Sequence, residues 1–120
     1  MGKFVMRNVN SGIKFDLKAD NGETIATSEP YSSAAACRKG IESVKKCAAI
    51  GRIEDQTEAD FVVLANPKME VYEDKAGLFR FRLRSRNGKI IAVSEGYTTK
   101  AACLAGVHSV IHNAPDAAIE

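Results

Sequence analysis

The sequence lacks the features that mark membrane, secreted or metal-binding proteins. No apolar run approaches the ~18 residues of a membrane-spanning helix, and the first residues lead into a strand-like pattern without a signal peptide. The three cysteines have no CxxC spacing, which argues against a disulfide framework and against a zinc site. We therefore expect a cytoplasmic protein with free thiols, no metal, no cofactor and no membrane contact.

The chain also has little excess charge of either sign. Its 17 basic and 15 acidic side chains leave a formal net charge of +2, which is smaller than the basic footprint usual for proteins that bind nucleic acid or membranes. Composition alone therefore points to no partner. At 120 residues, 45% of them apolar, the chain is long enough to bury one core of its own.

What the sequence does contain is an internal repeat. A shift of 66 positions aligns residues 13–45 with 79–111 without a gap and gives fifteen identities in thirty-three positions. The same shift aligns Val5 with Val71, and Ile53-Glu54 with Ile119-Glu120. A duplication is the simplest explanation of this similarity.

We therefore interpret the chain as a single α+β domain made of two repeats. Repeat 1 covers about 3–56 and repeat 2 about 69–120, with a linker at 57–68. The linker contains an apolar run at 61–64, and we expect it to pack partly on the domain.

Each copy predicts the same order of strands. Along the second strand, apolar residues alternate with charged ones, which is typical of a half-buried strand. Asn-Gly pairs at 21–22 and 87–88 then predict type I′ hairpins, because both turn positions need a positive φ. The three strands are expected at 3–8, 13–19 and 23–28, and again at 69–74, 79–85 and 89–94.

The period changes to that of a helix after each third strand. Hydroxyl residues at 32–33 and 98–99 are the expected N-caps, and Gly40 and Gly106 favour a close approach of each helix to the sheet. Short fourth strands are expected at 52–56 and 118–120. The buried helix faces are predicted to consist of Cys37, Ile41, Val44 and Ala48, and of Cys103, Val107, Val110 and Ala114.

The repeated pattern resembles that of a known family. The string NGExIxxSExYxxxxAxxxGIxSV occurs at 21–44 and, with small changes, at 87–110, and it is similar to the YegP-like family of domains of unknown function. The resemblance covers nearly the whole chain. It implies a duplicated β-β-β-α-β unit that forms one antiparallel sheet with two helices on one face, exchanges the last strands and mimics a dimer. It implies no activity, substrate or cofactor.

A row of basic side chains in the second copy is the most distinctive candidate site. These residues alternate along one strand and therefore project from one face of the sheet. Along an extended strand such side chains recur about every 6.7 Å, which is close to the phosphate spacing of a nucleic-acid strand. The possible anion-binding residues are Arg80, Arg82, Arg84 and Arg86, with Lys89 after the turn.

Two observations favour an ordinary solvated sheet face over an anion track. Glu70, Glu73 and Asp74 on the preceding strand can neutralise part of the row. In addition, no aromatic side chains are interleaved with the arginines for base stacking. We therefore interpret the row first as a set of cross-strand ion pairs and second as an anion-binding surface.

The cysteines are interpreted as structural residues. Cys37 and Cys103 lie on the apolar helix faces, where a thiol behaves as a small buried hydrophobe. Cys47 lies beside Lys45 and Lys46 in the last helical turn. We expect it to be the more exposed thiol.

Two further pairs of residues are candidates with an ordinary alternative. His108 and His112 have the i, i+4 spacing of a zinc pair, but no third ligand is evident and both fall on the predicted solvent face. Glu29 and Glu95 precede the helix caps, where a carboxylate stabilises the helix dipole. We interpret all four as surface or structural residues.

The sequence favours a non-enzymatic binding or interaction module, because it shows no nucleophile, base and orienting group in one pattern. We expect a monomer whose partner is unknown. One alternative is a weak nucleic-acid or phosphate binder that uses the arginine row. Another is an enzyme that uses Glu29, Glu95 or a thiol in a groove between the copies. Self-association through the sheet edges is a third.

Overall fold

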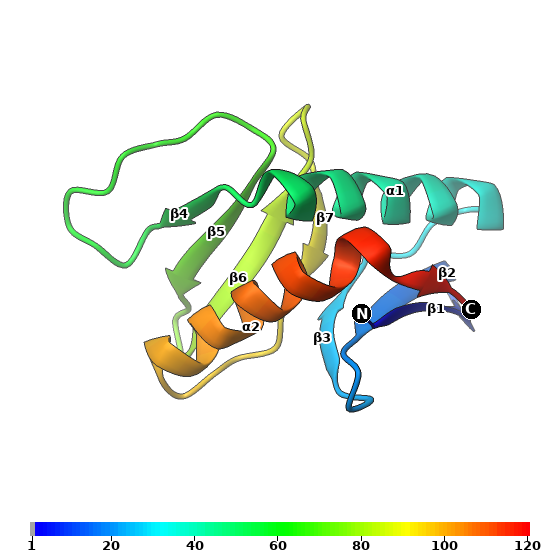
Figure 1. Ribbon diagram of the computed structural model, residues 1–120, viewed down its shortest axis with the longest axis horizontal. Coiled ribbons are helices and arrows are strands. Elements are labelled where there is room, and N and C mark those ends of the chain that lie inside the picture. Colours follow the sequence, from blue (N-terminus) through cyan, green and yellow to red (C-terminus); the bar gives the residue numbers. More distant parts are fainter. Residues whose placement is uncertain (1) are drawn as a thin grey trace.

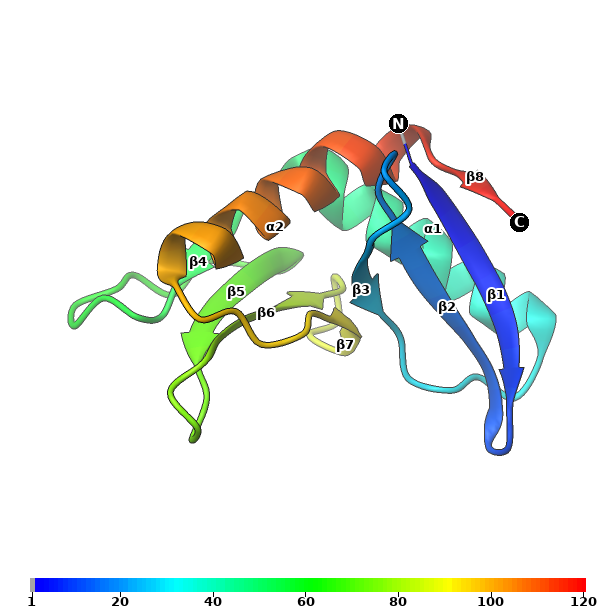
Figure 2. The same cartoon turned by 90° about the horizontal axis from the view of Figure 1, so that it is seen from below.

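The computed structural model describes residues 2–120, which form an eight-stranded sheet with two long helices on one face (Figures 1 and 2). The first copy contains β1 (Lys3–Val9), β2 (Gly12–Lys18), β3 (Thr24–Thr27), α1 (Ala34–Ile50) and β4 (Ile53–Asp55). The second contains β5 (Lys68–Glu73), β6 (Phe79–Arg84), β7 (Ile90–Val93), α2 (Lys100–Asn113), a short 3-10 helix η1 (Ala114–Asp116) and β8 (Ala118–Ile119). The predicted α+β fold, with its duplicated β-β-β-α-β unit, is confirmed.

The strand order shows that the copies exchange their last strands. The order is β4-β5-β6-β7-β3-β2-β1-β8, so β4 of the first copy lies beside β5 of the second, and β8 lies beside β1. These two edge pairs are parallel, whereas the other neighbours are antiparallel. The sheet is therefore mixed: the expected antiparallel order holds for the six inner strands, and each exchanged strand runs parallel to its new neighbour.

The two copies meet at the centre of the sheet. β3 and β7 pair only at Thr27 and Val93, so most of the backbone pairing between the copies lies at the exchanged edge strands. The buried side chains of both copies instead form one hydrophobic cluster between the sheet and the helices, with Phe15, Leu17, Phe81 and Leu83 among its fully buried members. Burial of apolar side chains and the exchanged edge strands therefore both hold the copies together.

Both Asn-Gly hairpins form, but the predicted type I′ turn is wrong. Among the described residues, only glycines have a positive φ, including Gly22 at 86°. The Gly22 N–H donates to the Ala19 carbonyl at 2.9 Å, and the Ala19 N–H donates to the Glu23 carbonyl at 2.9 Å. This pattern is a type I turn followed by a left-handed glycine bulge. It is favoured because the loop has a third residue, Asp20, and because the Asn21 side chain accepts a hydrogen bond from the Glu23 N–H at 3.0 Å.

The alignment of the first strands is wrong by one residue. Val5 lies opposite Asp16, whereas Val71 lies opposite the buried Phe81. Between the equivalent pairs Asn8–Ile13 and Glu73–Phe79, the second copy has one residue more than the first, so Val5 corresponds to Glu70 rather than to Val71. A slip of one residue exchanges the two faces of a strand, and this places a carboxylate on the open face of the second copy.

Each helix begins as predicted. Ser33 and Thr99 are the N-caps, and their side chains accept hydrogen bonds from Ala36 and Ala102, each at 3.1 Å. A tyrosine lies two residues before each N-cap. Tyr31 stacks on Phe15 and Tyr97 stacks on Phe81, with ring centroids 6.2 and 6.4 Å apart.

The tyrosines also explain the helical glycines. A Cβ added at Gly40 would meet the hydroxyl of Tyr31, and one at Gly106 would meet that of Tyr97. The helices do lie close to the sheet, but the space that each glycine leaves is filled by a tyrosine ring.

Residues 57–67 lie between β4 and β5 and are held by side chains near the end of the first copy. Arg52 donates to the Ala65 carbonyl at 2.7 Å, and the Leu64 N–H donates to Glu54 at 2.6 Å. Phe61, Val62 and Val63 remain exposed. No helix within residues 2–120 is both long and apolar enough to cross a membrane.

Candidate anion-binding site

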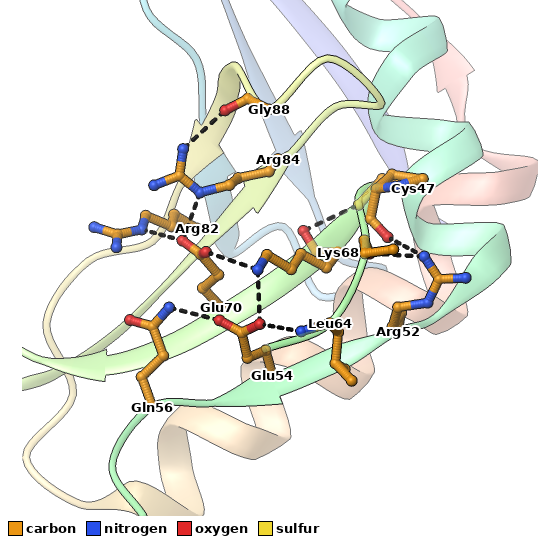
Figure 3. Close-up of polar contacts among 12 residues, drawn as sticks. Cys47, Arg52, Glu54, Gln56, Leu64, Lys68, Glu70, Arg82, Arg84 and Gly88 are labelled. Carbon is orange, nitrogen blue, oxygen red and sulfur yellow. Dashed lines mark hydrogen bonds and ion pairs between the residues drawn. The ribbon is translucent and has the colours of Figure 1, made fainter. Parts of the chain in front are cut away.

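The arginines of β6 project from the sheet face opposite the helices, as their alternation predicts. Arg80 pairs with Asp74 at 2.6 Å. Arg82 and Arg84 both donate to Oε1 of Glu70, at 2.6 and 2.8 Å (Figure 3). Three members of the row therefore bind carboxylates of the preceding strand and turn. The expected absence of an aromatic side chain among the arginines is wrong, because Arg82 lies over the Tyr72 ring, 4.3 Å from its centroid.

The shared carboxylate belongs to a larger charged cluster. Lys68 Nζ lies 2.6 Å from Glu54 and 3.5 Å from the second oxygen of Glu70 (Figure 3). The side chains of Lys68, Glu54 and Glu70 are only 7%, 1% and 5% exposed. These three residues, with Arg82 and Arg84, are called the charged cluster below.

Both carboxylates of the charged cluster are held in the ionised form. Burial raises the pKa of Glu54, but hydrogen bonds from Gln56, Lys68 and the Leu64 N–H outweigh burial and lower that pKa to about 2. Burial opposes ionisation of Glu70 too, and its pKa is nevertheless lowered by hydrogen bonds from Arg82 and Arg84. Because three cations share two carboxylates, the charged cluster retains one positive charge that its own carboxylates do not balance.

Arg86 is in a different environment because it follows the end of β6. It is exposed and makes no hydrogen bond or ion pair with the described residues. It lines a pocket of about 540 Å³ between the C-terminal half of α1 and the β6–β7 turn, which rises beside that helix in Figure 1. The pocket is lined by Ser43, Lys46, Ile50, Pro67, Ser85, Arg86 and Asn87.

The lining of this pocket suits an anion. Lys46 and Arg86 supply two positive charges, and no acidic side chain is present among the lining residues. Ser43 and the amide group of Asn87 add neutral hydrogen-bond donors, whereas the Ser85 hydroxyl already donates to Asn87. The nearby C-terminus of α1 carries about half a negative charge, which is smaller than the charge of the two cations. We call this hollow the anion pocket.

The opposite end of the molecule does not repeat this chemistry. Under the 66-residue shift, Lys46 corresponds to His112, Arg86 to Asp20, and Ile50 to Asp116. Both turns share the same hydrogen bonds, so the backbone is common to the two ends. The charge of the anion pocket therefore comes from side chains that differ between the copies.

The three thiols are buried. The exposed position expected for Cys47 is wrong: Cys47 is fully buried and donates to the Lys68 carbonyl at 3.5 Å. The helical angle places residue 47 beside Val44 on the core side, although its sequence neighbours are lysines. Burial raises the pKa of Cys47 and of Cys103 to about 11, and it also raises that of Cys37. None is a reactive thiolate at neutral pH.

The remaining candidates are dispersed over the surface. His108 and His112 are exposed, and residues 2–120 contain no group of three side chains arranged to hold a metal. Glu29 and Glu95 are also exposed, and neither carboxylate forms a hydrogen bond or ion pair within residues 2–120. Glu95 lines a hollow of about 220 Å³ at the junction of the copies, near the Arg7–Asp16 ion pair.

The sequence pattern indicates Arg86 as a candidate but does not indicate Lys46. The two residues are forty positions apart and belong to different copies, so no local pattern joins them. One signal was available, because Lys46 lies off the apolar helix face and its counterpart in the second copy is not a lysine.

Comparisons with known proteins agree with the internal repeat. The family model described as a domain of unknown function (DUF1508) matches residues 8–55 and again residues 74–120. A UPF0339 protein of Treponema denticola is 58% identical over 52 residues, which cover 43% of this chain and 90% of that protein. The UPF0339 protein YegP of Escherichia coli O157:H7 is 36% identical over 110 residues, which cover 89% of this chain and 84% of that protein.

Solved structures show the same fold. The solution structure of yegP from E. coli, a protein of unknown function, superimposes with a TM-score of 0.81 at 30% identity and covers 99% of this chain and 90% of that one. A UPF0339 protein from Shewanella oneidensis gives a TM-score of 0.80 at 29% identity, with 99% and 89% of the two chains covered. The resemblance to YegP-like proteins is confirmed. The chain therefore belongs to the DUF1508 (UPF0339) family and contains its domain twice in tandem.

Proposed function

We propose that this protein is a non-enzymatic binding module that takes up a small anion in the anion pocket. The observation that carries the proposal is the pairing of Lys46 with Arg86 around a hollow of about 540 Å³ that has no acidic lining residue. That volume lies within the range of small-molecule sites. An anion there would gain charge-assisted hydrogen bonds, which are the stronger kind.

A nucleic-acid strand is a less suitable ligand for the same surface. A strand needs successive cations along its backbone, but Arg80, Arg82 and Arg84 are already bound to carboxylates. Arg86 and Lys89 are too few to form a track. The proposal therefore favours one small anion over a polymer.

Thermal unfolding in phosphate provides the test. A dissociation constant on the order of 1 mM corresponds to about 4 kcal/mol of binding, and a tenfold excess of ligand over that constant stabilises the native state by about 1.4 kcal/mol. We expect inorganic phosphate to raise Tm relative to chloride at equal ionic strength. The increase should disappear in Lys46→Ala and in Arg86→Ala.

The control is Lys39→Ala, an exposed lysine on α1 that does not line the pocket. Phosphate also stabilises proteins non-specifically because it is excluded from their surfaces, and this effect should be equal in all variants. If Lys39→Ala and Arg86→Ala lose the same increment, or if neither loses any, the pocket is not the phosphate site.

An enzyme is less well supported. The thiols are buried with raised pKa values, and no base or nucleophile within residues 2–120 is hydrogen-bonded to Glu29 or Glu95. The cytoplasmic location is also part of the proposal. It is supported by three free cysteines, which suit a reducing compartment.

A further inference from the structure

The anion pocket has an apolar side as well as a charged one. Ile50 and Pro67 lie among its lining residues, together with the polar and charged groups. The Ile50 side chain is 46% exposed and is one of only five exposed large apolar residues within residues 2–120. Three of the others belong to the 61–63 segment. An inorganic ion makes no use of an apolar wall.

An exposed apolar residue occurs at this position in the first copy but not in the second. Its counterpart in the second copy is Asp116, which is exposed and polar, as residues at such a surface position usually are. Ile50 lies in the last turn of α1, one turn after Lys46. The helix therefore presents a cation and an apolar side chain to the same hollow.

The charge of the pocket indicates which anionic head group it fits. A phosphate monoester carries about −1.5 to −2 charges at pH 7 and three acceptor oxygens, whereas a carboxylate carries one charge and two oxygens. Lys46 and Arg86 supply two positive charges, and the guanidinium group can donate two parallel hydrogen bonds to a phosphate. The two cations therefore match a monoester dianion.

We propose that the ligand is an organic phosphate monoester, with its phosphate between Lys46 and Arg86 and its apolar group on Ile50 and Pro67. This inference rests on the proposed function and specifies the ligand class of the same pocket. The volume of about 540 Å³ accommodates the organic group as well as the phosphate. The cations determine whether the head group binds, and the apolar wall selects esters over the free ion.

Two probes separate these contributions: inorganic phosphate and butyl phosphate. Each is titrated into ¹⁵N-labelled protein at pH 7 and constant ionic strength, and the dissociation constant is taken from backbone amide shifts. We expect butyl phosphate to bind more tightly, by about fourfold for each methylene that leaves water. Ile50→Ser should abolish this preference and leave the affinity for inorganic phosphate unchanged, whereas Arg86→Ala should weaken both ligands.

Val62→Ser is the matched control, because Val62 is 73% exposed and lies outside the pocket. It should change neither affinity. In the unmodified protein, intermolecular nuclear Overhauser effects should join the butyl protons to the Ile50 methyl groups, and this readout does not depend on how any variant folds.

Each outcome bears on a different claim. Equal affinities for the two probes, or a butyl preference that survives Ile50→Ser, would overturn the organic ligand and leave the anion pocket in place. Butyl contacts with 61–63 instead of Ile50 would do the same. If neither probe shifts the resonances of the lining residues, the proposed function fails together with this inference.

Discussion

One ion pair occurs in both copies, but it is buried in one copy and exposed in the other. Glu54 and Lys68 are 2.6 Å apart and almost fully buried, whereas the corresponding pair, Glu120 and Lys3, is 3.5 Å apart with side chains 59% and 45% exposed. The 57–67 segment accounts for part of this difference, since its Leu64 N–H donates to Glu54. An exposed ion pair contributes little to the free energy of unfolding. Removal of one partner of a buried pair is strongly destabilising, because it leaves an uncompensated buried charge.

The pH dependence of stability should therefore depend on Glu54. Its pKa in the native state, about 2, lies below the ordinary glutamate value of 4.5, so the carboxylate stabilises the fold above about pH 4.5. This stabilisation, on the order of 3 kcal/mol, is lost as the pH falls toward 2. We expect Glu54→Gln to lower the free energy of unfolding at pH 7 and to flatten its decline between pH 4.5 and 2.

Glu120→Gln is the control, because it changes the same pair in its exposed setting. Denaturant unfolding at several pH values gives the free energies. A decline with the same slope in wild type and Glu54→Gln, or equal losses in the two variants, would show that burial does not strengthen the pair.

Single residues were predictable where one face of an element determines their environment. Cys37 and Cys103 were placed in the core from helical spacing, and both are fully buried. The charged neighbours of Cys47 in the sequence indicate an exposed position, but its helical angle determines its burial. The pairing of Arg82 and Arg84 with Glu70 was expected in outline, but the part played by Lys68 depends on a strand contributed by the other copy.

The helices depend on the fit between a glycine and a tyrosine. A Gly→Ala substitution inside a helix normally raises the free energy of unfolding by about 1 kcal/mol. At Gly40, however, the added Cβ would meet the Tyr31 ring. Overpacking of this kind costs typically 1–3 kcal/mol. We therefore expect Gly40→Ala to lower the free energy of unfolding, by up to about 2 kcal/mol.

A double-mutant cycle with Tyr31→Phe tests the cause of that loss. Removal of the hydroxyl, which lies nearest the added Cβ, should recover part of the loss, so the two substitutions should be less than additive. Gly40→Ala with increased stability, or strictly additive substitutions, would mean that the ring moves away at no cost.

Elements were predictable where their signal is local. The two-residue period of β2 and β6 and the helical period of α1 and α2 fix the type and order of these elements. The turn type was missed because Asp20 adds a residue to the loop, and the slip between β1 and β5 was missed because the alignment allowed no gap. The exchange of β4 and β8 followed only from the resemblance, since two or three residues carry no usable period.

In the whole molecule, duplication supplied two similar ends and divergence made them chemically different. The anion pocket combines α1 of the first copy, Pro67 of the connecting segment and the β6–β7 turn of the second copy. No single repeat contains it. The sequence could not reveal this site, because the distance between Lys46 and Arg86 depends on how the copies pack.

The most direct measurement of the anion pocket uses this pseudo-symmetry as its control. Inorganic phosphate is added to ¹⁵N-labelled protein at constant ionic strength, and the amide resonances of the two corresponding turns, 85–87 and 19–21, are followed. We predict saturable shifts at 85–87, together with Ser43 and Lys46, and no response at 19–21. Equal responses in both turns, or none in either, would contradict an anion site at one end of the molecule.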